Sequence, residues 1–293
     1  MKPTLIIIRY GEIWLKSEAT KKQFENKLIQ NIKNNLNEQK ILFQIKTQRG
    51  RIYLYTKQIK QATKVLTKTF GITSTSPATQ TTSTIESMKK HSLQITKKLT
   101  KKQTFALRIT REGKHNYTSQ QIAIKLGDII RKKTQAKVNL TQPDYTQYIE
   151  IRNQNAYFFT EKKPGPGGLP LGTQGNVLAI IDTKQSILAA WYLLRRGCQT
   201  IFLIKKTTTK PSVKSFIKNW YTNSKIIENK NTINKTISEH KCSAIITGHT
   251  FNEKNISIIK QIKKQTHLPV LTPLIHMNKK QIQQKTTEIG FKK

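Results

Sequence analysis

The chain has 293 residues, and its 53 Lys and Arg against 15 Asp and Glu give a formal net charge of +38. Self-repulsion at this charge destabilises a compact fold unless a polyanion neutralises it, so the composition favours a nucleic-acid partner. The sequence holds three aspartates, Asp128, Asp144 and Asp182, which argues against a cluster of carboxylates around a divalent metal.

Membrane, secretion and zinc-binding signals are weak. No apolar run approaches the length of a transmembrane helix, and the apolar part of the opening MKPTLIIIRYGE is too short for a secretion signal. Cys198 and Cys242 fit a reducing compartment and flank apolar segments, so we expect small core residues. With no Cys-x-x-Cys pair and scattered histidines, we predict a cytoplasmic protein that binds neither membrane nor metal.

The first third predicts a small α+β domain. An apolar strand is expected at 5–8 and a helix through Phe24, Leu28, Ile32 and Leu36. The runs ILFQIKT and GRIYLYT predict two strands around a turn at Gln48-Arg49-Gly50, and a helix is expected over 57–70. Strand, helix, two strands and helix are typical of the ferredoxin-like fold.

A second unit is expected after the segment GITSTSPAT, to which we assign no strand. Helices are predicted over 85–99 and 119–132, and TFALRITREGKHNYT predicts a strand followed by a basic loop. Further strands follow, broken by turns at 142–144 and 153–155. The run KKPGPGGLPLGTQG, dense in Gly and Pro, is the clearest linker.

From Val177 onward, strands and helices alternate. Apolar strands are expected in VLAII, TIFLI, KII, SAIITG and PVLTPL, and helices over 186–196, 212–221, 232–240, 252–265 and 279–289. Continuous apolar strands separated by helices indicate a doubly wound parallel sheet. Such a sheet binds its ligand at the carboxyl ends of its strands, which directs attention to the turn after VLAII.

Six motifs carry a family resemblance. LIIIRYGEIWLKS, FENKLIQNIKNNL, FGITSTSPA, LRITREGKHNYTS, GGLPLGTQGNVL and AAWYLLRRGC, in this order, resemble the tRNA 4-thiouridine synthetase family, a tRNA sulfurtransferase that also serves thiamine biosynthesis in some organisms. Family members adenylate the uridine at the eighth nucleotide of tRNA and then replace its oxygen with sulfur.

The resemblance covers nearly the whole chain and implies a multidomain protein of α+β and α/β units. It implies an N-terminal ferredoxin-like domain over 1–75, a THUMP RNA-binding domain over 76–163, a Gly/Pro linker over 164–176 and a Rossmann-like PP-loop pyrophosphatase domain over 177–293.

The ATP loop departs from the family pattern Ser-Gly-Gly-x-Asp-Ser. The aligned residues are Asp182, Thr183, Lys184, Gln185 and Ser186, with Asp182 and Thr183 where the glycines belong and the loop one residue short. Each replacement adds a Cβ where backbone must approach phosphate, and Asp182 adds a negative charge, although Lys184 can itself bind phosphate. His249 stands where the family has Glu and is expected to be an ordinary loop residue.

We therefore predict a degenerate adenylation site with no catalytic residue and with neither ATP nor Mg²⁺ as a cofactor. The sequence ends at Lys293, before the segment in which the family carries its sulfur-transfer cysteine, so we expect no such segment and no rhodanese extension.

The RNA-binding pattern, in contrast, is retained. Basic side chains can contact phosphates, and an aromatic ring can stack on a splayed base of the tRNA 3′ end. The predicted RNA-binding residues are Arg108, Arg111, Lys114, His115, Tyr117, Lys162 and Lys163.

Three functions remain open. The leading hypothesis is a protein that binds tRNA or another structured RNA and holds it, for example for a separate RNA-modifying enzyme. The first alternative is an active tRNA sulfurtransferase that uses ATP and Mg²⁺, with Lys184 and Ser186 on the phosphates and a partner sulfur carrier. The second alternative is a ribosome-associated rRNA-binding protein.

Overall fold

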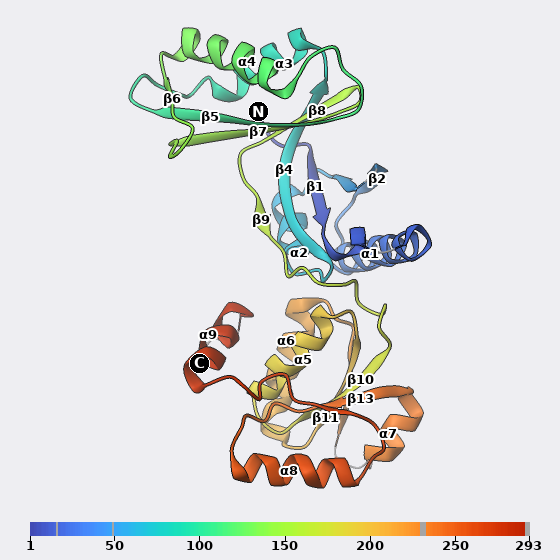
Figure 1. Ribbon diagram of the computed structural model, residues 1–293. Coiled ribbons are helices and arrows are strands. Elements are labelled where there is room, and N and C mark those ends of the chain that lie inside the picture. Colours follow the sequence, from blue (N-terminus) through green and yellow to red (C-terminus); the bar gives the residue numbers. More distant parts are fainter. Residues whose placement is uncertain (16, 49, 229–232, 291–293) are drawn as a thin grey trace. The chain divides into compact units, whose positions relative to one another are not determined.

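The structure is a computed structural model that describes residues 1–15, 17–48, 50–228 and 233–290 (Figure 1). The chain divides into two compact units, one formed by Met1–Arg9, Lys40–Thr67 and Ser74–Pro164 and the other by Tyr10–Gln39, Lys68–Thr73 and Gly165–Lys293. Arg49 of the predicted turn and Thr232 at a predicted helix start lie outside the described residues.

A mixed sheet of nine strands forms the first unit. Its strands in spatial order are β2 (Gln44–Gln48), β3 (Arg51–Tyr55), β1 (Leu5–Tyr10), β4 (Ile72–Thr82), β8 (Asn155–Phe159), β7 (Tyr145–Arg152), β5 (Thr104–Glu112) and β6 (Lys137–Val138), and β9 (Lys163–Pro164) pairs with β4. The helices in this part of the chain are α2 (Ile59–Leu66), α3 (Ile85–Thr96) and α4 (Ser119–Thr134). The helices and strands follow one another along the chain in the predicted order, apart from β4. The domain boundaries stay predictions.

The strand β4 is a correction, because the sequence predicts no strand in GITSTSPAT. Ser, Thr and Pro dominate this segment and hide its β character. Pro77, which has no N–H to donate, falls between the part of β4 that pairs with β9 (Ser74 and Thr75) and the part that pairs with β8 (79–82). The missing donor therefore costs neither of these two pairings a hydrogen bond.

One face of the β5–β7–β8 region is covered by α3 and α4 (Figure 1). Thr118 and Gln121 form a reciprocal capping box that starts α4. Because strand side chains alternate, Ile149 and Ile151 of β7 join the helix-covered core, while Glu150 lies on the opposite face.

Glu150 anchors the face of the sheet opposite these helices. Its side-chain oxygens accept hydrogen bonds from Arg9 Nη2 at 2.6 Å and from Arg51 Nε at 3.1 Å, and Glu150 is 6% exposed. Burial by itself would raise the pKa of the Glu150 carboxyl, but the charges of Arg9 and Arg51 outweigh burial and lower the pKa. Beside this cluster, the rings of Tyr53 and Tyr157 stack with their centroids 4.6 Å apart.

A parallel sheet of five strands forms the core of the second unit. Its spatial order is β12 (Lys225–Glu228), β11 (Gln199–Ile204), β10 (Asn176–Ile181), β13 (Cys242–Ile246) and β14 (Val270–Leu271). The helical elements of this unit are η1 (Glu12–Leu15), α1 (Glu18–Glu38), α5 (Gln185–Arg195), η2 (Thr207–Thr209), α6 (Lys210–Trp220), α7 (Ile233–His240), α8 (Glu253–Lys264) and α9 (Lys279–Glu288).

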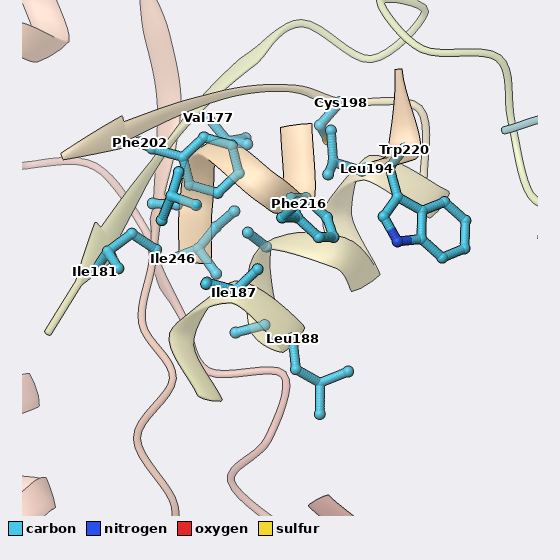
Figure 2. Close-up of a cluster of buried hydrophobic side chains, with 14 of the residues drawn as sticks. Val177, Ile181, Ile187, Leu188, Leu194, Cys198, Phe202, Phe216, Trp220 and Ile246 are labelled. Carbon is cyan, nitrogen blue, oxygen red and sulfur yellow. The ribbon is translucent and has the colours of Figure 1, made fainter. Parts of the chain in front are cut away.

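Helices cover both faces of this sheet, as the alternation of apolar strands and helices predicts. In β10, Val177 and Ile181 face the core built with α5, α6 and α9, whereas Leu178 and Ile180 face the core built with α7 and α8. Figure 2 shows the first of these cores, in which Phe202 and Phe216 pack beside the α5 side chains. The strand β10 and the helix α5 are therefore fixed by burial, and the turn between them is held at a defined place.

Replacing Glu150 by Ala leaves the charges of Arg9 and Arg51 without the carboxylate that both contact. We expect the free energy of unfolding to fall by about 3–5 kcal/mol in urea titrations followed by circular dichroism. The matched control is Asp128→Ala, which removes an exposed carboxylate from its pair with Arg131 and should change stability by less than about 1 kcal/mol. Equal losses in the two variants would contradict a structural role for Glu150.

Candidate functional site

The second unit has a topological switch point between β10 and β13. The chain adds β11 and β12 on one side of β10, and β13 and β14 lie on the other side. The carboxyl ends of β10 and β13 therefore flank the crevice in which a doubly wound sheet binds its ligand. Asp182 follows β10 directly, and the Thr247-Gly248-His249 segment follows β13.

The Asp182 carboxylate is held inside this crevice by two side chains. Ser186 Oγ donates a hydrogen bond to Asp182 Oδ1 at 2.6 Å, and His249 Nε2 lies 3.1 Å from Asp182 Oδ2. Gln185 Nε2 donates to the Gly248 carbonyl oxygen at 2.7 Å. The turn after β10 is thus tied both to the first turn of α5 and to the segment after β13.

Gly248 makes this connection tight. A Cβ at this position would lie 2.5 Å from Ser186 Cα, so the backbone after β13 packs directly against the first turn of α5. His249, which follows, is buried, with 7% of its surface exposed. The sequence predicts an ordinary loop residue here, and the structure instead makes His249 the partner of Asp182.

Asp182 is ionised at neutral pH. Burial favours the neutral acid, but hydrogen bonds from His249 and Ser186 and the charge of His249 outweigh burial and lower the pKa of Asp182 to about 2. A phosphate site at a helix amino terminus needs N–H donors and positive charge. The crevice instead holds a carboxylate, paired with His249, beside the start of α5.

The cysteines are buried, as expected of core residues. Cys198 and Cys242 are each 7% exposed, and burial raises the pKa of both thiols, that of Cys242 to about 11. Thiols with raised pKa values are poor nucleophiles at neutral pH.

The described residues offer neither a metal-ligand cluster nor a membrane-spanning helix. Within residues 1–15, 17–48, 50–228 and 233–290, no three His, Cys, Asp or Glu side chains gather closely enough to hold a metal ion. No helix in this part of the chain is both long and apolar enough to cross a membrane.

The predicted RNA-binding loop at the end of β5 is compact and basic. Arg111 Nη1 lies 3.4 Å from His115 Nδ1, and His115 Nε2 lies 2.8 Å from the Asn153 carbonyl oxygen. Gly113 has a φ of +100°, and a Cβ there would lie 2.4 Å from Asn153 Oδ1, so the turn requires glycine. Arg111, near the end of β5, and Lys114, in the loop that follows, are both exposed.

The remaining predicted side chains lie elsewhere in the unit. Arg108 and Arg111 are three residues apart on β5, so their side chains point to opposite faces of the sheet. Arg108 is paired in register with Tyr148 and therefore lies on the open face. There it donates a hydrogen bond to the Leu140 carbonyl oxygen. Lys162 Nζ lies 4.5 Å from the centre of the Tyr148 ring. Lys163 pairs with Glu161 at 3.1 Å.

Tyr117 corrects one part of the RNA-binding prediction. Its side chain is 8% exposed and belongs to the core beneath α3 and α4. Its hydroxyl donates a hydrogen bond to the Ser83 carbonyl oxygen at 2.6 Å. Tyr117 therefore supports the start of α4 and offers no open ring face to a base.

Sequence reasoning missed a hollow on the open face of the sheet. A cavity of about 480 Å³ is lined by residues of β2, β3, β4 and β8, among them Lys46, Tyr55, Gln80, Asn155 and Tyr157. Tyr55 Oη donates to Gln80 Oε1 at 2.8 Å. The alternation of tyrosines with apolar residues in GRIYLYT was the available signal for a polar, aromatic face.

Three segments of the chain match protein families. Residues 5–76 match the ThiI ferredoxin-like domain, residues 82–161 match the THUMP domain, and residues 227–293 match the thiamine biosynthesis protein ThiI. The turn at 182–186 lies outside these three matches.

Relatives with similar sequences are called probable tRNA sulfurtransferases. That of Methanobrevibacter smithii is 37% identical over 210 residues, which cover 69% of this chain and 54% of the relative. That of Methanocaldococcus jannaschii is 31% identical, with 97% of this chain and 87% of the relative covered. The matched part thus spans about half the length of the first relative and most of the second.

Solved structures agree with these matches. The crystal structure of PH1313 from Pyrococcus horikoshii superimposes with a TM-score of 0.86 at 28% identity, over 98% of this chain and 100% of that chain. The fold also matches a 4-thiouridine synthetase in complex with RNA and ATP, with a TM-score of 0.79 at 23% identity over 99% and 85% of the two chains.

The pair formed by Asp182 and His249 makes the stability of the fold depend on pH. The variant Asp182→Asn keeps the side-chain size but loses the charge. We expect it to lower the free energy of unfolding at pH 7 by about 1–2 kcal/mol, because solvent partly screens a carboxyl that is about a quarter exposed. The folded-state pKa of about 2 lies below the ordinary value of 3.8, so this stabilisation is full above 3.8 and is lost as the pH falls to about 2.

The stability difference between wild type and Asp182→Asn should therefore close between about pH 4 and about pH 2. Urea midpoints measured across this range test it. A difference that stays constant down to pH 2 would show that the charge of Asp182 is not what stabilises the turn.

Proposed function

Because this chain belongs to the tRNA sulfurtransferase (ThiI) family, we propose that it binds tRNA, or another structured RNA, and does not adenylate it. The observation that carries the proposal is the ionised Asp182 carboxylate, held by Ser186 and His249 where the family scaffold would receive phosphate. Relatives of this chain carry names that place their activity on tRNA.

The charge distribution supports RNA binding. The net charge of +38 favours any polyanion, and the first unit presents basic groups at two places, the loop with Arg111 and Lys114 and the open sheet face with Arg108 and Lys162. Contacts with phosphate and sugar position a structured RNA without reading its sequence. The protein would hold its RNA by shape and charge, either for a separate modifying enzyme or within a larger RNA assembly.

The turn after β10 supports the loss of adenylation. A pyrophosphate beside α5 would lie next to the Asp182 carboxylate, which is paired with His249, and neutralising Asp182 by protonation would require a pH near its pKa of about 2. Gly248 packs against Ser186 at backbone level, which anchors the turn in this arrangement. Lys184 is exposed at the end of the turn and supplies one positive charge, but it does not replace the two glycines of the family pattern.

Removal of the basic loop should weaken RNA binding. In the double variant Arg111→Ala with Lys114→Ala, we expect the dissociation constant for tRNA to rise roughly three- to tenfold and the slope of log affinity against log salt to become shallower by about one to two. Fluorescence anisotropy at several KCl concentrations measures both quantities. The control is Lys214→Ala with Lys218→Ala, two exposed residues of α6 that remove the same charge. An equal effect of the control, or wild-type binding that does not weaken with salt, would contradict the proposed loop site.

Catalytic assays should give no signal. With tRNA, ATP, Mg²⁺ and a sulfur donor, we expect neither ATP–pyrophosphate exchange nor thiolated tRNA above background, in parallel with an active sulfurtransferase as positive control. Exchange or thiolation that Lys184→Ala abolishes would establish the alternative, an active enzyme with a divergent ATP loop.

A further inference from the structure

The strand β2 is the longest of the four strands at which the two sheets end. The spatial order of the described strands ends at β2 and β6 in the first unit and at β12 and β14 in the second. The strands β6 and β14 have two residues each and β12 has four, whereas β2 has five residues and no proline. The side chains of Gln44, Lys46 and Thr47 are exposed. An edge of this length is a template on which another strand can pair.

The outer backbone of β2 has polar groups that face away from the sheet. Only two residues separate Gln48 from Arg51, so these two form a hydrogen-bonded pair between β2 and β3. By alternation, Ile45 and Thr47 direct their N–H and C=O groups away from β3. In the part of the chain that the structure describes, β2 pairs with β3 alone. Its outer side therefore offers two donors and two acceptors with the spacing of a strand ladder.

The segment that carries this edge is basic throughout. Between residues 40 and 67 the sequence contains no Asp or Glu, and its basic residues are Lys40, Lys46, Arg49, Arg51, Lys57, Lys60 and Lys64. Lys46 stands in the middle of β2, with its Nζ 5.5 Å from the centre of the Tyr55 ring. A second copy of this chain would bring like charge to the edge, and like charges on facing strands are destabilising. The charge therefore favours an acidic strand over a second copy.

A hollow beside the edge has room for the side chains of an added strand. The cavity of about 480 Å³ on the open face is lined by Lys46 and Gln48 of β2 and by Tyr53 and Tyr55 of β3. Every second side chain of an added strand would lie on this face of the sheet. Unpaired backbone groups next to a side-chain hollow are the features by which sheets bind extended peptides. RNA has no repeating N–H and C=O groups along its backbone, so the edge favours a polypeptide.

We propose that the outer edge of β2 binds an extended acidic segment of a partner protein as an additional strand of the sheet. The backbone of that segment pairs with the N–H and C=O groups of Ile45 and Thr47. Its acidic side chains lie near Lys46, and alternate side chains lie over the hollow. The inference goes beyond the proposed RNA binding and does not depend on it, because its ligand is a protein and its binding groups belong to the backbone of one strand.

The experiment uses a defined acidic peptide as the probe. The probe is fluorescein-labelled (Glu-Thr)4, and its control is the same peptide methylated at every backbone nitrogen, which keeps the charge and removes the N–H donors. We expect the wild-type protein to bind the unmodified peptide saturably at low salt and the methylated peptide at least about tenfold more weakly. Binding of the unmodified peptide should also slow amide hydrogen exchange at Ile45 and Thr47.

Two variants test the edge itself. Thr47→Pro removes an outward N–H and leaves the bonds to β3 in place, so it should weaken peptide binding roughly tenfold with an unchanged circular dichroism spectrum. Lys46→Ala removes the charge at the middle of the edge and should weaken peptide binding about two- to fivefold. The matched control is Lys64→Ala, which removes the same charge from an exposed position on α2 and should change peptide binding less.

The outcomes separate the possible occupants. Equal binding of the two peptides would mean attraction by charge alone and would overturn the inference, as would binding of neither peptide or equal effects of Lys46→Ala and Lys64→Ala. If tRNA slows exchange at Ile45 and Thr47 and the acidic peptide does not, the edge belongs to RNA and the inference fails. If Thr47→Pro does not fold, the exchange measurement on the wild type decides. None of these failures bears on whether the protein binds tRNA.

Discussion

The contact of the Asp182 carboxylate with Ser186 and His249 is the interaction on which the functional account depends. The strand before it and the helix after it keep the frame of a nucleotide-binding domain, because Val177, Ile181 and the α5 side chains are locked into a common core (Figure 2). Within that fixed frame, the turn that should cradle phosphate instead holds a carboxylate whose pKa has fallen to about 2. The proposed loss of adenylation thus rests on a few residues at the carboxyl edge of this sheet.

In a chain with few acidic residues, the buried carboxylates of Glu150 and Asp182 each hold basic partners. With 15 acids against 53 bases, most positive charge must remain at the surface, where a polyanion can reach it. Glu150 accepts hydrogen bonds from Arg9 and Arg51, which allows these arginines to lie beside the aromatic side chains of the sheet. Asp182 is paired with His249. Both carboxylates keep lowered pKa values because positive or hydrogen-bonding partners outweigh the cost of burial.

The sequence predicted the elements of the chain well where burial dictates a pattern. The alternation of apolar strands and helices after Val177 gave the doubly wound sheet, and the spacing of Phe24, Leu28 and Ile32 gave the long helix α1. It failed at β4, because Ser, Thr and Pro conceal a strand whose partners are supplied by distant segments. The β-propensity of a segment depends on its own residues, whereas the formation of a strand also depends on the distant strands that pair with it.

The candidate sites were harder to predict for the same reason. Spacing placed Arg108, Arg111 and Tyr117 in one basic loop, but the period of the strand sends Arg108 to the opposite face, and Tyr117 fills the core under α4. His249 looked like an isolated loop histidine because its partner Asp182 follows a different strand. The hollow beside Lys46 combines residues of four strands, and only the topology of the sheet brings them together.

We propose a scaffold that receives RNA and no longer binds ATP at the turn after β10. The most direct measurement is a calorimetric titration of ATP with Mg²⁺ into the preformed complex of the protein with tRNA. We expect the tRNA complex to give no saturable heat up to millimolar ATP. Saturable ATP binding that Lys184→Ala removes would contradict it.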